Sequence, residues 1–314
     1  MTGKPLSAGG PFGTLPVPTN GDAPPEREPS ALRARQRLDW DRIAGSIGEL
    51  RGAPSTEYYR RCEIALISRS LGDLAGKRVL KLDLWNEAFN TRILHWMAQQ
   101  GAEAHGLDLS RVVVHRARRN TRDAGQPARL LRADIRELPF ATGSFDAVYT
   151  MGTIEHIDEY LDAIGEVRRV LRPGGRAIIG VPHKWNVFLR PAMVWLLDQC
   201  GKYAYAPEKS FSGPELRRSI ESSGLVVRER TGILSIPGIL RMADLFLYKR
   251  RIPLYRLSPL LLWPFERLET RYRWPGLFGY LVAMVAEKPA DGAGEMSVAS
   301  PAHGNGAAAG AVGQ

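Results

Sequence analysis

The chain has 314 residues, of which 44% are hydrophobic and 24% charged, as expected of a globular protein with one or two domains. Its net charge of +10 favours phosphates or anionic lipids as partners, although a solvated basic surface explains the same number. Two cysteines exclude a disulfide framework, no signal peptide is recognisable, and no apolar run reaches the ~20 residues that span a bilayer. We therefore expect a cytoplasmic protein.

The two ends of the chain differ in composition from its middle. Residues 1–30 and 290–314 are rich in small and polar residues, and they bury too little apolar surface to offset the entropy of ordering. We expect both segments to be disordered. Residues 31–76 are predicted to form an N-terminal helical cap, and residues 77–289 the main domain.

The main domain alternates between strand and helix patterns. Its predicted strands cover residues 79–84, 102–109, 128–134, 144–152, 176–182, 225–233 and 276–289. Helices are predicted over residues 88–100, after the N-cap Ser110, and over 157–171 and 212–224. This alternation predicts an α/β fold with a doubly wound, mostly parallel sheet.

Chemically useful side chains follow several of these strands, at the edge where such sheets bind ligands. Asp108 ends the second strand, where a carboxylate can accept hydrogen bonds from a ribose diol; a helix-capping acid is the alternative. Asp134 and Ile135 follow the third strand and suit an adenine, although a turn aspartate would read the same way. His156 follows the fourth strand and is either a general base or a residue that shapes the loop and packs on a cofactor. His183 ends the fifth strand and is either a general base or a hydrogen-bonded loop histidine.

Three stretches resemble, in order, the motifs of class I S-adenosylmethionine-dependent methyltransferases of the small-molecule, ubiquinone-biosynthesis-related type. They read GLDLS, RADIRELPFATGSFDAVYTMGTIEHI and EVRRVLRPGGRAIIGVP. The resemblance is close over residues 77–184 and looser over 210–288. It implies a seven-stranded Rossmann-like sheet and S-adenosylmethionine as the cofactor. The implied contacts are Asp108 with the ribose, Asp134 and Ile135 with the adenine, and Met151, in the segment 150–156, at the boundary between cofactor and acceptor.

The stretch RVLKLDLWNEAFNT departs from that family's first loop, which follows an acid with Gly-x-Gly-x-Gly. Lys81 stands at the acid position, and Asp83, Trp85 and Glu87 stand where glycines are expected. Either the loop takes a different path, with Asp83 or Glu87 meeting the ammonium group of the cofactor, or the site no longer works. The remaining motifs are intact, which favours a working site.

A long insertion, residues 236–275, precedes the last strand and mixes aliphatic and aromatic side chains with Arg and Lys. We expect it to be helical. The mixture suits an anionic membrane interface, but apolar residues that simply pack on the sheet would give the same pattern. The high aliphatic share disfavours nucleic acid. As a lid, the insertion would determine which acceptor binds.

The leading hypothesis is methyl transfer to a small-molecule, lipid-linked or sugar-linked acceptor, with O-methylation favoured and peripheral contact with the inner face of the membrane. Such transfer needs mainly in-line positioning of the acceptor, so no metal ion is expected. The competing hypothesis is a catalytically silent methyltransferase-fold protein that acts as a membrane-associated binding or scaffold module. The sequence does not indicate an oligomeric state.

Overall fold

The computed structural model describes residues 31–125, 128–188, 190–200, 208–271 and 279–290. The N-terminal segment 1–30 and residues 291–314, which we predicted to be disordered, lie outside the described residues.

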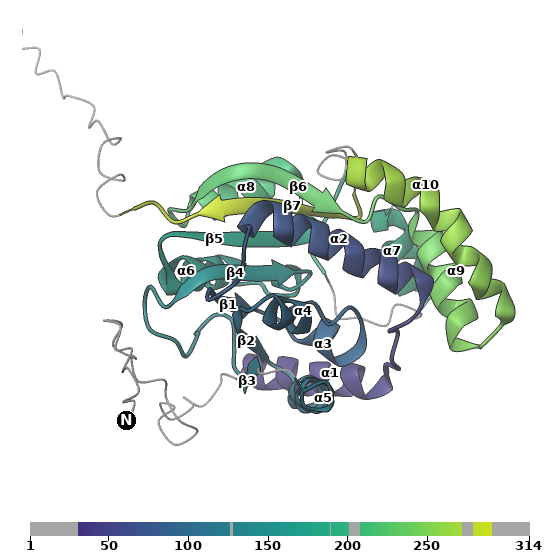
Figure 1. Cartoon of the computed structure of the whole chain (residues 1–314), viewed down its shortest axis with the longest axis horizontal. Helices are drawn as coiled ribbons and strands as arrows, with labels where there is room; N and C mark the ends of the chain where they lie inside the picture. Colours follow the sequence, from purple (N-terminus) through teal and green to yellow (C-terminus); the bar gives the residue numbers. More distant parts are fainter. Residues whose placement is uncertain (1–30, 126–127, 189, 201–207, 272–278, 291–314) are drawn as a thin grey trace, which may run out of the picture.

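Seven strands form one sheet in the order β3-β2-β1-β4-β5-β7-β6, in which β7 is antiparallel to both neighbours and the other pairs are parallel (Figure 1). The predicted doubly wound sheet is therefore confirmed. The strand order reverses between β1 and β4, which creates a crevice at their C-terminal ends. The strands are β1 (Arg78–Lys81), β2 (Glu103–Asp108), β3 (Ala128–Arg132), β4 (Phe145–Met151), β5 (Leu171–Pro182), β6 (Val226–Ile233) and β7 (Leu281–Glu287).

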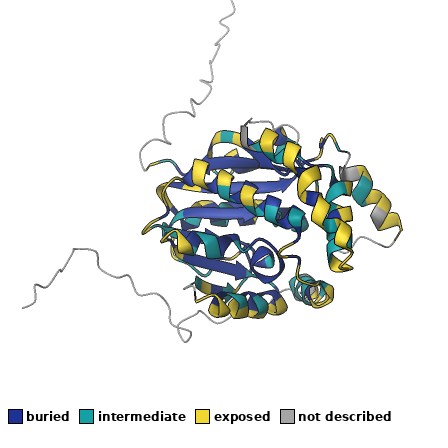
Figure 2. Ribbon diagram, turned by 45° about the vertical axis from the view of Figure 1, so that its right-hand side comes forward, coloured by how far each residue is buried: buried dark blue, intermediate teal, exposed yellow. Residues whose placement is uncertain are grey.

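Each face of the sheet carries its own apolar core, because alternate side chains of a strand point to opposite faces. In β1, Val79 packs against the helices of one face and Leu80 against those of the other. Figure 2 shows buried strands between helices whose outer sides are exposed. The first face is covered by α2 (Pro54–Leu71), α4 (Ile93–Gln99) and α5 (Arg111–Asp123), and the second by α6 (Tyr160–Val170) and α8 (Gly213–Glu221).

The stretch predicted as one helix, residues 88–100, is broken in the structure. A short helix, α3 (Trp85–Phe89), comes first, and α4 starts only after Arg92. Arg92 has a left-handed backbone (φ 53°), and the N–H groups of Asn90 and Arg92 both donate to the carbonyl of Asn86. The prediction of one helix was wrong, because the spacing of the apolar residues does not reveal the break in the helix at residues 90–92.

Two helical segments close the ends of the crevice. α1 (Ala31–Ser46) packs on α5, whose N-terminus is capped as predicted: Ser110 accepts a hydrogen bond from the N–H of Val113 (3.3 Å). At the other end, the insertion before β7 is helical, as predicted. It consists of α9 (Gly238–Lys249), η2 (Pro253–Leu257) and α10 (Ser258–Arg271).

The insertion stands beyond the C-terminal ends of the strands, at the right of Figure 1, beside α2. The Arg61 side chain of α2 pairs with Glu266 of α10 (2.5 Å), and Tyr58 donates a hydrogen bond to Glu269. These contacts fix α10 on the body of the domain. Among the described residues, no helix is both long and apolar enough to cross a membrane.

Candidate active site

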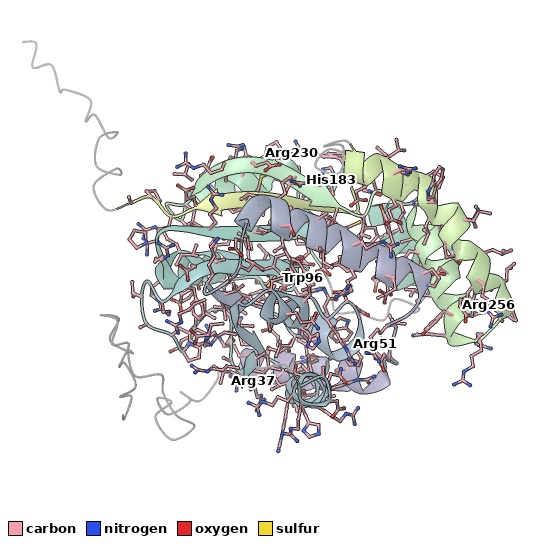
Figure 3. All side chains as sticks on the ribbon, viewed as in Figure 1. Arg37, Arg51, Trp96, His183, Arg230 and Arg256 are labelled. Carbon is pink, nitrogen blue, oxygen red and sulfur yellow. The ribbon has the colours of Figure 1, made fainter. Side chains whose placement is uncertain are left out.

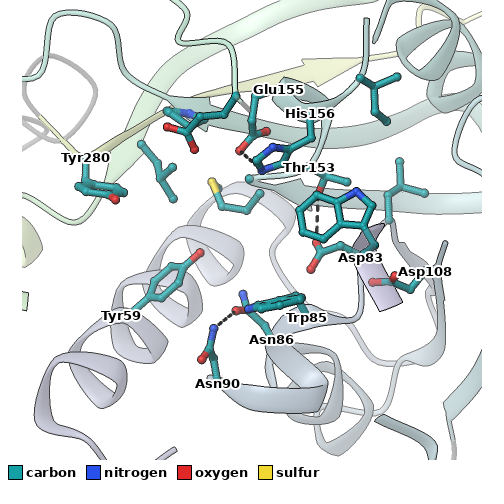
Figure 4. A pocket seen from close by; sticks show the side chains of 18 of the residues that line it. Tyr59, Asp83, Trp85, Asn86, Asn90, Asp108, Thr153, Glu155, His156 and Tyr280 are labelled. Atoms are coloured by element: carbon teal, nitrogen blue, oxygen red, sulfur yellow. Dashed lines mark hydrogen bonds and ion pairs between the residues drawn. The ribbon is translucent and has the colours of Figure 1, made fainter. Parts of the chain in front are cut away.

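A cavity of about 400 Å³ lies at the C-terminal ends of the parallel strands (Figure 4). The segments that follow β1, β2, β3 and β4 form its floor. α1 borders it on one side, and α9 and α7 (Arg190–Gln199) border it on the other. Its position at the switch in strand order and its volume are those of a ligand site in a doubly wound sheet.

α3 takes the place of the expected glycine-rich turn. Leu84, which precedes it, is fully buried against Gly106 of β2, where a Cβ atom would lie 2.6 Å from the Leu84 side chain. Asp83, Trp85 and Asn86 line the cavity. The loop therefore takes a different path and presents side chains, in place of bare backbone, to a ligand.

Lys81 is fully buried behind this wall. Its ammonium group lies 2.8 Å from a carboxylate oxygen of Asp83 and 3.3 Å from one of Glu87, and it donates to the Asp83 carbonyl (2.8 Å). Burial alone would lower the pKa of Lys81, but the two carboxylates outweigh it and raise that pKa. Burial raises the pKa of Glu87, and Lys81 partly offsets the rise.

Of the two carboxylates predicted for the first loop, only Asp83 reaches the cavity. Glu87 is 2% exposed, does not line the cavity, and accepts a hydrogen bond from the N–H of Leu94 at the start of α4 (2.7 Å). The expectation that Glu87 meets the cofactor is corrected: its carboxylate is used to hold Lys81 and to cap α4. Lys81 therefore pairs with the negative charge of Glu87, which does not face the cavity.

Glu63 of α2 holds the loop from the other side. It accepts hydrogen bonds from the Thr91 hydroxyl (2.5 Å), the Tyr149 hydroxyl (2.7 Å) and the Asn86 amide (3.2 Å). Burial raises the pKa of Glu63 to about 7, and these donors offset part of the rise. One carboxylate from the N-terminal cap therefore fixes both ends of α3.

Asp108 ends β2 and lines the cavity. Its carboxylate accepts hydrogen bonds from the N–H groups of Leu84 (2.9 Å) and Ser110 (2.8 Å). Burial raises the pKa of Asp108 to about 7, and those two N–H groups limit the rise. The capping alternative applies, because the carboxylate supports the loop and the α5 N-terminus. Asp108 also borders the cavity, and its contact with a ribose stays a prediction.

Asp134 and Ile135 line the cavity as well, but the Asp134 carboxylate already has a strong partner. Arg136 donates to both of its oxygens, from Nε at 2.9 Å and Nη2 at 2.7 Å, and pairs also with Glu159 (2.7 Å). Burial raises the pKa of Asp134, but the hydrogen bonds and positive charge of Arg136 outweigh burial, so the pKa is lowered. An adenine amine would share this carboxylate with the guanidinium, so the adenine contact stays a prediction.

The segment 150–156, for which we predicted the boundary between cofactor and acceptor, contributes to the lining of the cavity. Met151, Thr153 and His156 line it, and the Thr153 hydroxyl donates to Asp83 (3.3 Å). The His156 ring stands edge-on to Trp40 of α1, with ring centroids 5.0 Å apart. His156 is therefore placed to contact a bound molecule, either by packing or as a base.

His183 does not share this position. It is 2% exposed, lies outside the cavity lining, and its N–H donates to the Tyr280 carbonyl (3.1 Å). Burial lowers its pKa. The structure brings the adjacent Pro182 to the cavity and leaves His183 behind it, so the expectation of a base at His183 is not supported by its placement.

Several lining residues were not predicted from the sequence. Five of them come from helices and loops away from the strand ends: Trp40, Tyr59, Asn90, Arg241 and Leu245. The sixth, Tyr280, immediately precedes β7. Tyr59 belongs to the N-terminal cap, and Arg241 belongs to the insertion. The insertion's aromatic and basic composition was noted, but no local pattern says which of its arginines turns inward.

Comparison with known proteins agrees with this geometry. Residues 89–179 match the family described as methyltransferase domain. The chain is 33% identical over 173 residues, 49% of its length, to a demethylmenaquinone methyltransferase of Thermus thermophilus, and it covers 76% of that protein. It is 27% identical over 144 residues, 45% of its length, to a ubiquinone biosynthesis O-methyltransferase of Methylobacterium, and it covers 58% of that one.

Among solved structures, the cyclase SpnF is similar with a TM-score of 0.52 and 17% identity, over 73% of this chain and 81% of that one. At this identity the likeness concerns the fold alone. The seven-stranded sheet with β7 antiparallel and the cavity at its switch point define a class I methyltransferase architecture. By its relatives, the chain belongs to the S-adenosylmethionine-dependent methyltransferases of the small-molecule class.

The cavity suits the cofactor of that family, S-adenosylmethionine, which carries positive charge on its sulfonium and ammonium groups. Five carboxylate residues line the cavity against two arginines, one of which, Arg136, is paired with Asp134 and Glu159. The carboxylate of Asp108 stands where a ribose diol would donate to it. The loop without glycines has therefore reshaped this end of the crevice, and a cavity remains beside it.

Proposed function

We propose that the protein methylates an oxygen atom of a small acceptor with an apolar tail, which it takes from an anionic membrane surface. The carrying observation is the position of α9. This helix forms a wall of the cavity with one side and exposes an apolar, basic surface with the other. The relative named for ubiquinone biosynthesis is an O-methyltransferase, which supports oxygen as the methylated atom.

The acceptor end of the cavity lies toward β7, α7 and the part of α9 that follows Arg241. Asp108 and Asp134, which we propose to contact the nucleoside, follow the neighbouring strands β2 and β3 and so lie in one half of the crevice. The other half is lined mainly by apolar side chains, including Met193, Leu245 and Leu281. Such a lining accommodates hydrocarbon better than a sugar or a charged polymer.

Bound S-adenosylmethionine supplies an activated methyl group, so the chain's own residues mainly position and deprotonate. Asp108 would hold the ribose, and Asp83 would place negative charge near the cofactor's cationic groups. His156 lies 3.9 Å from the Glu155 carboxylate at the centre of the cavity, where it would take the proton of an acceptor hydroxyl.

The outer surface of the insertion suits a lipid headgroup region. Large apolar side chains stand exposed on it, including Leu260 at 74% and Ile239 at 70%. Lys249, Arg250 and Arg256 are exposed nearby, and Figure 3 shows Arg256 at the far end of this unit. Exposed hydrocarbon flanked by cations binds anionic bilayers better than neutral ones.

Vesicle flotation tests the membrane contact. The protein should float with vesicles of 30% phosphatidylglycerol in phosphatidylcholine and bind pure phosphatidylcholine far less, by roughly tenfold or more. Leu260→Glu with Trp263→Glu should abolish flotation because both side chains stand exposed on α10. Leu161→Glu on α6, also an exposed leucine, is the matched control and should float normally.

Methyl transfer is tested separately with radiolabelled S-adenosylmethionine and a membrane lipid extract. Label should enter the organic phase, and mass spectrometry of the product should place it on oxygen. Asp108→Ala, which removes the ribose contact, should abolish incorporation. Label that stays in the aqueous phase with a sugar or protein acceptor would refute the lipid-linked assignment.

A further inference from the structure

Oδ1 of Asn90 and Nη1 of Arg241 are buried polar atoms of the cavity wall that have no hydrogen-bond partner among the described residues. Both residues line the cavity. Buried polar groups are nearly always paired in folded proteins, because an unpaired one loses its hydration without compensation. An unpaired acceptor and an unpaired donor in one cavity therefore indicate a ligand that supplies both kinds of partner.

The orientation of the Asn90 amide is fixed by its neighbours. The Glu63 carboxylate accepts from Nδ2 of Asn86, which turns Oδ1 of Asn86 toward Asn90. That oxygen accepts from Nδ2 of Asn90 (3.1 Å; Figure 4). Oδ1 of Asn90 is thus left as an acceptor for a donating group.

Arg241 lines the same cavity as Asn90 but comes from α9. Its guanidinium lies over the ring of Tyr59, 5.0 Å from the centroid, and in the described part of the chain no carboxylate comes within ion-pair distance of it. The second lining arginine, Arg136, is saturated by Asp134 and Glu159. Arg241 is accordingly the lining cation with capacity for an anionic group.

We propose that Arg241 and Asn90 bind the amino-acid end of S-adenosylmethionine, with Arg241 donating to its carboxylate and Asn90 accepting from its ammonium group. The inference rests on the cofactor assignment made above. The wall to which they belong begins at α3, where the family's glycine loop would stand. Side chains from α3 and from the lid helix α9 take over the recognition of this end, aided by the negative charge of Asp83.

The proposal concerns the amino-acid end of the cofactor and not its nucleoside, so two ligands that differ in this end can test it. S-adenosylhomocysteine carries the amino-acid group, and 5′-methylthioadenosine has the same nucleoside without it. Calorimetric titration of the full chain should show the first binding about 100-fold more tightly, as expected for hydrogen bonds to charged groups. Arg241→Met should weaken S-adenosylhomocysteine binding by roughly 10- to 100-fold and leave 5′-methylthioadenosine unchanged. Asn90→Ala should act in the same direction, by roughly tenfold.

Arg217→Met is the control variant, because Arg217 of α8 lies outside the cavity lining and its exposed side chain pairs with Glu221 on the same helix (3.1 Å). It should change neither affinity. If Arg241→Met weakens both ligands equally, or neither, the proposal is wrong; unchanged binding would assign Arg241 to an acidic acceptor group instead. If the folded wild-type protein binds neither ligand, the cofactor assignment itself fails, a result distinct from a failure at Arg241.

Discussion

Asp108 contacts the loop before α3 and the N-terminus of α5, and it also lines the cavity. The sequence identified it from its place at the end of a strand, and the structure adds that two backbone N–H groups already bind its carboxylate. Its raised pKa, about 7, means that near neutral pH a proton competes with any donor from a ligand. This competition gives cofactor binding a pH dependence.

We expect the affinity for S-adenosylhomocysteine to fall roughly tenfold per pH unit below about pH 7, because the ribose diol needs the ionised carboxylate. Above pH 8 the affinity should level off. The empty protein follows the opposite sign: this carboxyl stabilises the fold at low pH and loses that contribution as pH rises from its ordinary 3.8 through about 7. Titrations between pH 5.5 and 8.5 measure the effect, and Asp108→Asn should flatten the profile.

Lys81, which stands where the family has an acid, supports the fold by pairing with two buried carboxylates. Lys81→Met would leave the buried carboxylates of Asp83 and Glu87 without their cation, which typically costs about 3–5 kcal/mol. Urea denaturation should detect a loss of this size. Glu87→Gln in the same chain should recover part of it.

Arg217→Met is the matched control for that measurement, because it breaks an exposed pair with Glu221 on α8. Exposed pairs contribute about 0–1 kcal/mol. A loss at Lys81 no larger than that at Arg217 would show that the buried network does not support the fold.

At the scale of elements, the strands and their order of appearance followed from the sequence because buried parallel strands are unbroken apolar runs between turns. α3 did not follow. Its existence depends on Glu63, some twenty residues earlier in the chain, and on the left-handed Arg92, and neither leaves a periodic pattern. The site residues at strand ends were predictable for the same reason, whereas Tyr59 and Arg241 reach the cavity only through tertiary packing.

The role of α1 can be tested by breaking the hydrogen bonds that hold it on α5. Asp41 accepts hydrogen bonds from the Ser110 hydroxyl (2.5 Å) and the Val112 N–H (3.2 Å), which ties α1 to the start of α5. Asp41→Ala should cost about 1 kcal/mol, as for a lost helix cap, and weaken S-adenosylhomocysteine binding severalfold, because Trp40 would leave the cavity rim. Hydrogen exchange of α1 amides should rise.

Asp39→Ala provides the comparison on the same helix. Within the described part of the chain, the ion pair of Asp39 is local, with Arg42 at 3.3 Å, and both side chains are exposed. Unchanged exchange and affinity are expected there. Equal effects of the two substitutions would argue that α1 responds to loss of any charge and is not held at Asp41.

For the whole molecule, composition and periodicity were enough for the fold class, and the motif series was enough for the family. They were not enough for the acceptor. The fold is shared with a protein known as a cyclase, so the architecture does not determine the reaction by itself. What distinguishes this chain lies in the first loop and in the insertion, and the cavity is where these two meet.

The sheet also has an order of assembly, set by where its last strand lies. β7 is synthesised after every other strand, yet it pairs with β5 on one side and β6 on the other. A growing chain that has reached β6 therefore has an open edge on β5 and no partner strand for β6, and α9 and α10 emerge before β7 does. Such edges invite wrong partners. A chain interrupted just before residues 281–287 would therefore retain the cofactor motifs and five paired strands but lack the strand that joins β6 to β5.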